Sequence, residues 1–106
     1  MTKPPTFDAV IHAPNRLQIC AFLAPLTDAE FPTLRDTLGV SDSVLSKHLR
    51  VLEESGYVKI KKATVDSRVR TRVSLTAAGR RAYRNHIAAL QVLVSVDPAV
   101  RLEPSP

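Results

Sequence analysis

Hydrophobic positions repeat along the chain with two different periods, that of a helix and that of a strand. Between residues 41 and 55, leucines stand at i, i+4 and i+7: Leu45, Leu49 and Leu52. This spacing is typical of an amphipathic helix. Ser41 can cap its first turn, Asp42 complements the helix dipole, and Gly56 follows as the terminating residue. We therefore predict a helix over residues 41–55 with one buried and one exposed face.

Two shorter helical patterns precede it. Pro14 lies near the start of the first, where a missing N–H is harmless, and Pro25 ends it. Residues 17–24 are apolar around more than half of the helix, which predicts burial on two sides. The second helix covers residues 32–38 and is followed by Gly39, a residue that readily takes a left-handed C-terminal conformation. This helix, the turn and the next helix together predict a helix-turn-helix.

After Gly56 the period changes from 3.6 to 2. Residues 58–61 and 68–75 alternate apolar with polar or charged side chains, which predicts a hairpin with one apolar and one cationic face. The tip, residues 63–67, contains no glycine, so we expect a loop longer than a two-residue turn. Because Phe31 precedes a proline and so favours extended geometry, a short strand could lie near it.

A last helix is predicted over about residues 77–96, with Thr76 as its N-cap. Its apolar stripe continues at helical spacing: Tyr83, Ile87, Leu90 and Val94. The fold class is thus α+β, mainly α with a small β-hairpin, in the order α-α-α-β-β-α. We expect a flexible N-terminal arm at residues 1–10, one winged helix domain at 11–96, and a disordered tail at 97–106.

Length and composition fit a small single domain. With 106 residues, 44% of them hydrophobic, the core is thin and a partner subunit would help to cover it. No apolar run approaches the roughly 18 residues of a membrane span, and no signal-peptide pattern opens the chain, so we expect a soluble cytoplasmic protein. Cys20 is the only cysteine, which excludes a disulfide framework and a Cys-rich zinc site within one chain.

The positive charge is concentrated in one part of the chain. The net charge is +5, yet the segment from Lys47 to Arg84 alone carries eleven basic residues against three acids. Such a concentration is typical of a protein that binds a polyanion, and double-stranded DNA is the expected partner. On the exposed face of helix 41–55, short serines let the backbone approach a groove, and Lys47 can reach guanine acceptors. The candidate DNA-binding residues are Ser41, Ser43, Val44, Ser46, Lys47, Arg50, Lys61, Arg68, Arg70 and Arg72.

Neither catalysis nor a metal site is expected. His12, His48 and His86 lie on separate predicted helices without the spacing of a ligand pair, so we expect no metal and no cofactor. His48 precedes Leu49 of the buried stripe and is expected to be a buried or half-buried structural residue. The sequence contains no Gly-rich phosphate loop and no activated nucleophile, which argues against an enzyme.

The end of the last helix has little within one chain to pack against. A second copy of the same helix is the simplest partner, and its two-fold axis would space two helix-turn-helix units about one DNA turn apart. The candidate dimerisation residues are Leu17, Cys20, Tyr83, Ile87, Leu90 and Val94.

The chain contains four characteristic stretches in this order: PNRLQI from Pro14, LRDTLGV from Leu34, LSKHLRVLEESGYV from Leu45 and LTAAGR from Leu75. Together they resemble the small winged helix regulators of the MarR/ArsR superfamily. The resemblance covers about residues 11–95. It implies a homodimer joined through its first and last helices that binds a pseudopalindromic operator and represses transcription. It also implies that Ser43, Val44, Ser46, Lys47 and Arg50 contact the major groove and that residues 68–72 form the wing.

Two features of the superfamily are missing from this sequence. The sequence lacks the extra terminal helices of full-length MarR proteins, so the usual ligand pocket of those proteins is not expected. Oxidation of Cys20 and a small apolar ligand at the dimer contact are the two alternatives for a signal. The paired Cys and His ligands of metal-sensing ArsR members are absent too, so metal control is not expected. Two other functions remain as alternatives to a sequence-specific repressor: a winged helix that binds protein, and a non-specific nucleic-acid binder.

Overall fold

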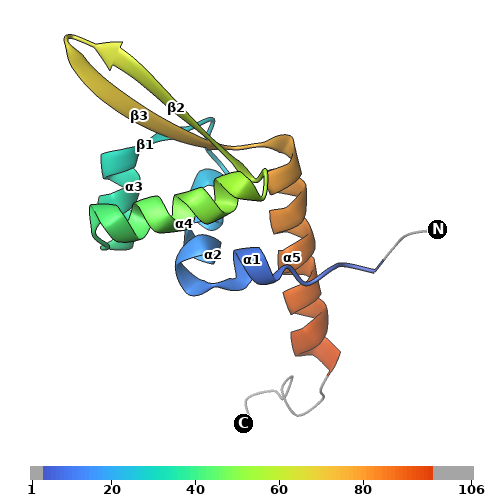
Figure 1. The fold of residues 1–106 in the computed structure, drawn as a ribbon. Helices are drawn as coiled ribbons and strands as arrows, with labels where there is room; N and C mark the ends of the chain where they lie inside the picture. The colour runs from blue at the N-terminus through green and yellow to red at the C-terminus, as the bar shows by residue number, and fades with distance from the viewer. Residues whose placement is uncertain (1–3, 97–106) are drawn as a thin grey trace.

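A computed structural model of the chain describes residues 4–96 and has the winged helix architecture (Figure 1). Its elements are α1 (Ala9–His12), α2 (Pro14–Leu23), β1 (Ala29–Glu30), α3 (Phe31–Leu38), α4 (Asp42–Glu54), β2 (Val58–Val65), β3 (Arg68–Leu75) and α5 (Ala77–Val96). The first four helices pack together below the base of the β2–β3 hairpin, which projects from the body, and α5 runs along one side (Figure 1). The predicted fold class, mainly α with a small sheet, is confirmed.

The helix-turn-helix forms as its sequence signals indicate. Gly39 ends α3 with φ of +69°, a left-handed conformation that glycine adopts without steric cost. Ser41 caps α4, because its Oγ accepts a hydrogen bond of 3.2 Å from the backbone N–H of Val44. The predicted stripe of Leu45, Leu49 and Leu52 is buried. The face of α4 opposite this stripe is therefore turned to solvent.

The N-terminal segment is more ordered than the sequence suggested. Asp8 Oδ1 accepts hydrogen bonds from the backbone N–H groups of Val10 (2.9 Å) and Ile11 (3.0 Å) and so caps α1. Ile11 is fully buried. The prediction of a flexible arm is thus wrong for residues 8–10, because a four-residue helix is too short to show periodicity. The predicted tail at 97–106 lies outside the described residues.

A single apolar core unites the helices with the base of the sheet. Its buried members are Ile11, Ile19, Cys20, Leu23, Ala29, Leu34, Leu45, Leu49, Leu52, Val58, Val73 and Leu75. Cys20 is fully enclosed within its own chain, so its expected place in a subunit contact is wrong. Burial and the nearby Asp8 carboxylate raise the pKa of the Cys20 thiol to about 11. The thiol therefore stays protonated, which makes it a weak target for oxidants.

The sheet is antiparallel with the strand order β1-β3-β2. Its hairpin turns through only two residues, Asp66 and Ser67, which both have positive φ (51° and 64°). The expectation of a longer loop is therefore wrong: a two-residue turn with both φ positive matches the twist of the strands, and Asp tolerates that conformation without glycine. β1, near the predicted position, pairs with β3 at Ala29↔Val73 and Glu30↔Arg72.

The start of α5 is fixed against the residues that follow α4. The backbone N–H of Thr76 donates to the carbonyl of Tyr57 at 3.0 Å. The Thr76 hydroxyl donates to the carbonyl of Gly56 at 2.6 Å and accepts from the N–H of Gly79 at 2.9 Å. Gly79 is packed so closely that a Cβ placed on it would lie 2.0 Å from the Tyr57 carbonyl oxygen.

We predict that Gly79→Ala destabilises the protein by about 1–3 kcal/mol or more, because the methyl group would push α5 away from the Tyr57 backbone. Urea unfolding followed by circular dichroism measures the effect. As a control, Arg81→Ala on the exposed side of the same turn should change the free energy of unfolding by less than about 0.5 kcal/mol. A Gly79→Ala protein as stable as the original would contradict this packing.

Candidate nucleic-acid interface

The outer face of α4 carries most of the predicted DNA-binding residues. Five of them are exposed along it: Ser43, Val44, Ser46, Lys47 and Arg50. Ser41 is also exposed, but its hydroxyl is already engaged as the helix cap and lies 3.2 Å from the Ser43 hydroxyl. The face thus combines small hydroxyl side chains, one methyl-bearing side chain and two cations. This set can approach base edges closely and also contact phosphates.

Arg35 holds the turn between α3 and α4. Its Nη1 donates to Asp42 Oδ1 and its Nε to Asp36 Oδ1, both at 2.9 Å. Hydrogen bonds to Asp36 and Asp42 raise the pKa of Arg35 further above its usual range. The pairing offsets the negative charge of Asp42 at the exposed N-terminal end of α4. Sequence reasoning missed Arg35, because a partner seven positions away across a turn follows no helical spacing.

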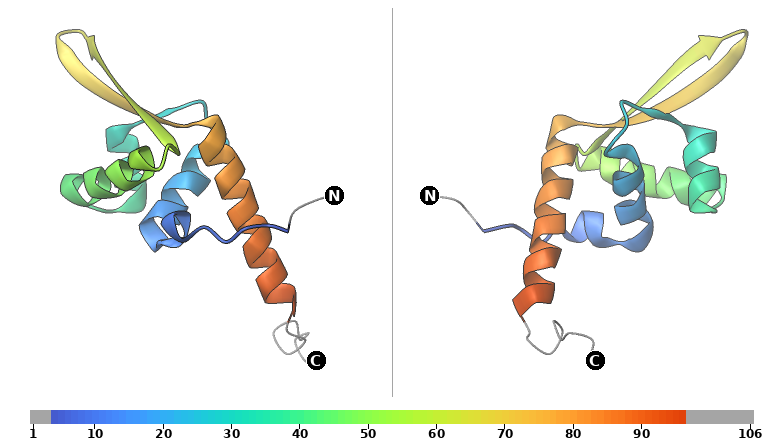
Figure 2. Two further views of the ribbon diagram at one scale, coloured as in Figure 1. Left: turned by 45° about the vertical axis from the view of Figure 1, so that its right-hand side comes forward. Right: turned by 180° about the vertical axis from the view of Figure 1, so that it is seen from behind.

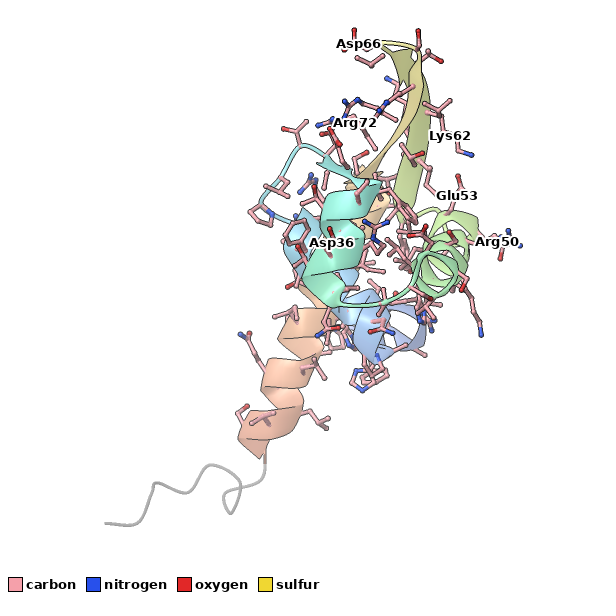
Figure 3. The ribbon with its side chains drawn as sticks, turned by 90° about the vertical axis from the view of Figure 1, so that its left-hand side faces the viewer. Asp36, Arg50, Glu53, Lys62, Asp66 and Arg72 are labelled. Atoms are coloured by element: carbon pink, nitrogen blue, oxygen red, sulfur yellow. The ribbon has the colours of Figure 1, made fainter. Side chains whose placement is uncertain are left out.

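The two sides of the β2–β3 hairpin differ in their charged residues. Since side chains alternate along a strand, the register that pairs Lys61 with Arg72 puts these two residues on one side and Lys62 with Thr71 on the other. Lys62 and Arg72 accordingly point to opposite sides of the hairpin, and Arg50 lies on the side of Lys62 (Figure 3). The predicted wing residues occupy the side that faces away from α4: Lys61, Arg68, Arg70 and Arg72.

A groove lies between α4 and the hairpin. Its volume is roughly 650 Å³, and its polar lining includes Ser46, Arg50 and Glu53 from α4 and Lys62 and Thr71 from the hairpin. Two cations, one from each wall, thus face the same space. Sequence analysis named Lys61 as a candidate DNA-binding residue and missed Lys62. The alternation of the strand could have identified Lys62, since position 62 shares a side of the strand with the buried Val58 and the half-buried Ile60.

Arg70 and Arg72 of β3 form ion pairs with the acidic residues of β1 and of the position before it. Arg72 reaches Asp28 at 2.9 Å and Glu30 at 3.1 Å, and Arg70 reaches Glu30 at 3.3 Å. The hydrogen bond from Arg72 lowers the pKa of Asp28. These pairs connect β1 and the residue before it to β3. Among the ion pairs within residues 4–96, none involves Lys61 or Arg68, which leaves these two side chains as the better candidates for phosphate on that side.

His48 is half-buried, as predicted, and joins α4 to α2. Its Nδ1 lies 3.2 Å from Arg16 Nη1, and its Nε2 lies 3.3 Å from Asn15 Nδ2. Burial and the positive charges of Arg16 and Lys47 lower the pKa of His48. Across residues 4–96, no three His, Cys, Asp or Glu side chains gather as ligands for a metal ion.

The predicted dimerisation residues are not equivalent. Leu17 and Tyr83 pack, half-buried, against the core of their own chain. Ile87 and Leu90 are half-buried on α5. The last turns of α5 extend past the rest of the fold (Figure 2), and three consecutive apolar residues there are exposed: Val92 (50%), Leu93 (64%) and Val94 (55%).

No helix within residues 4–96 is long and apolar enough to cross a membrane.

Comparison with known proteins agrees with this geometry. A family model described as a winged helix DNA-binding domain matches residues 15–94. An uncharacterized protein of Methanocaldococcus jannaschii is 40% identical over 72 residues, which span 68% of this chain and 78% of that protein.

Solved structures give the same result. A transcriptional regulator homologue from Pyrococcus horikoshii OT3 superposes with a TM-score of 0.79 and 31% identity, over 88% of this chain and 89% of that one. ZitR, a zinc-responsive MarR family member from Lactococcus lactis, gives a TM-score of 0.58 and 26% identity, over 73% of this chain and 52% of that one. The chain therefore belongs to the family of winged helix DNA-binding domains and is a MarR-like DNA-binding transcriptional regulator.

Proposed function

We propose that this protein is a homodimeric repressor that recognises a specific operator sequence. The observation that carries the proposal is the convergence of Arg50 of α4 and Lys62 of the hairpin on one groove beside the exposed serines of α4. A DNA backbone that follows this groove has α4 in the major groove on one side and the hairpin in the minor groove on the other. Phosphate contacts in the groove would then set the register of α4 on the duplex.

Base recognition falls to the first half of α4 in this arrangement. Ser43 and Ser46 can donate to or accept from base edges, and Lys47 can donate to the acceptors of guanine. Val44 can contact the methyl group of thymine. Arg68, next to the turn of the hairpin, is the candidate for the minor groove, where a narrow groove concentrates negative potential. Sequence preference therefore depends on α4 more than on the wing.

The dimer is proposed from the exposed apolar end of α5. Leu93 and Val94 are more than half exposed and lie three and four positions after the half-buried Leu90, so these apolar side chains are neighbours on one face of α5. A contiguous apolar surface on a small domain is typical of an association site. Pairing two copies of α5 would cover these residues and give a closed two-fold assembly with two α4 helices available for one operator. An effector bound beside this contact remains a prediction from the sequence.

We predict that Lys47→Ala reduces the preference for operator DNA over a scrambled duplex, because it removes a contact to base edges. Lys62→Ala should weaken binding to both duplexes by a similar factor and lower the slope of log K against log salt by about one. Arg81→Ala serves as the matched control, with a smaller effect, because it removes the same charge from an exposed position of α5 outside the groove. Fluorescence anisotropy with duplexes from the protein's own upstream region, at two salt concentrations, measures all three.

Equal binding of both duplexes by the original protein would favour a non-specific nucleic-acid binder. The absence of binding even at low salt would favour a protein-interaction module. If specific binding is found, transcription from the bound promoter should fall as the protein is added in vitro, and a rise would contradict repression.

We predict that Leu93→Glu converts the dimer to a monomer, because two carboxylates would be brought together in an apolar contact. Light scattering coupled to size exclusion should then give the mass of one chain, 11.6 kDa, rather than twice that mass. Gln91→Glu adds the same charge to a neighbouring exposed position and should leave the dimer intact. A Leu93→Glu protein that keeps the mass of two chains would rule out this interface.

A further inference from the structure

We propose that His12 and His86 form a proton-operated latch that holds the N-terminal segment, residues 4–8, and α1 against α5, and that one added proton opens it. The inference does not depend on DNA binding or on dimerisation. It rests on a cluster that joins two parts of the chain more than 70 positions apart in sequence.

The latch consists of two consecutive hydrogen bonds. The backbone N–H of Asp8 donates to Nδ1 of His86 at 2.9 Å. Nε2 of His86 lies 3.1 Å from Nδ1 of His12. His86 is fully buried, and the ring of Phe7 packs against both imidazoles, with centroid distances of 4.7 Å to His12 and 4.8 Å to His86. Both imidazoles are thus held in place by contacts from the N-terminal segment.

The direction of these bonds determines where the protons are. A backbone N–H can only donate, so Nδ1 of His86 must present its lone pair. The single proton of a neutral His86 ring is then on Nε2 and is donated to Nδ1 of His12, which must also present a lone pair. Both imidazoles are therefore neutral while the latch is closed, and each has one defined tautomer.

No arrangement of protons keeps both hydrogen bonds after one proton is added. A proton on Nδ1 of His86 would face the N–H of Asp8, and a proton on Nδ1 of His12 would face the Nε2–H of His86. If the proton of His86 moves from Nε2 to Nδ1, the Nε2 can accept from His12, but the Nδ1–H then faces the N–H of Asp8. A buried donor facing another donor loses its hydrogen bond and is left unsatisfied, which is costly. One proton is therefore enough to break the contact.

The surroundings of His86 set the direction of the pH dependence. Burial and then the electrostatic effect of the neighbouring His12 ring lower the pKa of His86, and the carboxylate of Asp8 opposes this shift. Two other titratable groups nearby, Tyr57 and Cys20, interact with Asp8. The Tyr57 hydroxyl donates to Oδ2 of Asp8 at 2.7 Å, and the negative charge of Asp8 contributes to the raised pKa of the buried Cys20. Tyr83 lies one turn before His86 on α5.

Since the pKa of His86 is lower with the latch closed than with it open, the open form binds the proton more tightly. The stabilisation that the latch provides is therefore fully present above the ordinary histidine pKa of about 6.5 and is lost as the pH falls below it. When the latch opens, Asp8 also loses its two other interactions, the hydrogen bonds that cap α1 and the hydrogen bond from the Tyr57 hydroxyl. The effect thus reaches the residues that follow α4.

Amide hydrogen exchange of the full chain, followed by NMR, tests the proposal. The protection factor of the Asp8 amide, corrected for intrinsic exchange, should fall by about tenfold or more between about pH 7.5 and about pH 5. In His86→Asn the side-chain carbonyl can still accept from the Asp8 N–H but cannot titrate, so protection should stay nearly constant over this range. His48→Gln removes the other histidine with a lowered pKa, outside the latch, and should behave like the original protein.

Unchanged protection in the original protein would overturn the proposal, and so would an equal loss of protection in His86→Asn. If His86→Asn fails to fold at neutral pH, long-range proton–nitrogen spectra of the original protein provide a second test. These spectra should show His86 protonated on Nε2 alone at about pH 7.5, with both nitrogens protonated in the acidic form. A neutral ring protonated on Nδ1 would contradict the latch.

Discussion

The close contact between α5 and the backbone of Tyr57 is the point at which α4, α5 and the N-terminal segment are joined. The N–H of Tyr57 donates to the carbonyl of Leu52 at the end of α4, and its carbonyl accepts from Thr76 at the start of α5. Its side-chain hydroxyl reaches Asp8 of the N-terminal segment. Only a residue without a side chain at position 79 leaves space for this carbonyl. This contact therefore joins the end of α4 to the start of α5, the helix through which the proposed dimer forms.

Charge serves two separate purposes in the hairpin. Arg70 and Arg72 pair with Glu30 and Asp28, and exposed ion pairs of this kind contribute about 0–1 kcal/mol each to stability. Their main effect is geometric, since they tie the hairpin to β1 and so fix the direction in which it leaves the body. Lys62, on the other side of the same strands, belongs to the groove beside α4. Counting cations along the strands could not separate these two groups.

The sequence predicts features that depend on neighbouring residues and misses those that depend on distant ones. Ser41, Gly39 and the leucine stripe predict α4 and its boundaries because capping and periodicity are local. The pairing of Arg72 with Asp28 joins positions 44 apart, and that of His12 with His86 joins positions 74 apart, so neither has a local signal.

Cys20 illustrates a related limit on prediction from the sequence. α2 is apolar around much of its circumference, and periodicity alone cannot distinguish the side that meets its own chain from a side that could meet another. The candidate DNA-binding residues of α4 were predictable because exposure follows from the stripe. Those of the wing required the register of the hairpin as well.

The two-residue turn at Asp66 and Ser67 limits how this wing can change in length during evolution. A single inserted residue in one strand would shift the register and turn its side chains to the opposite face, moving Val73 and Leu75 out of the core. Growth at the tip therefore requires one added residue in each strand, and each such pair lengthens the hairpin by about 3.4 Å. Arg68 is the residue beside the turn in this protein. Because side chains alternate along a strand, each added pair places the residue beside the turn on the opposite side of the hairpin. The length of the wing and the side that its tip residue faces are thus coupled. Only the addition of two pairs at a time, about 7 Å, lengthens the wing and keeps the tip residue on the same side.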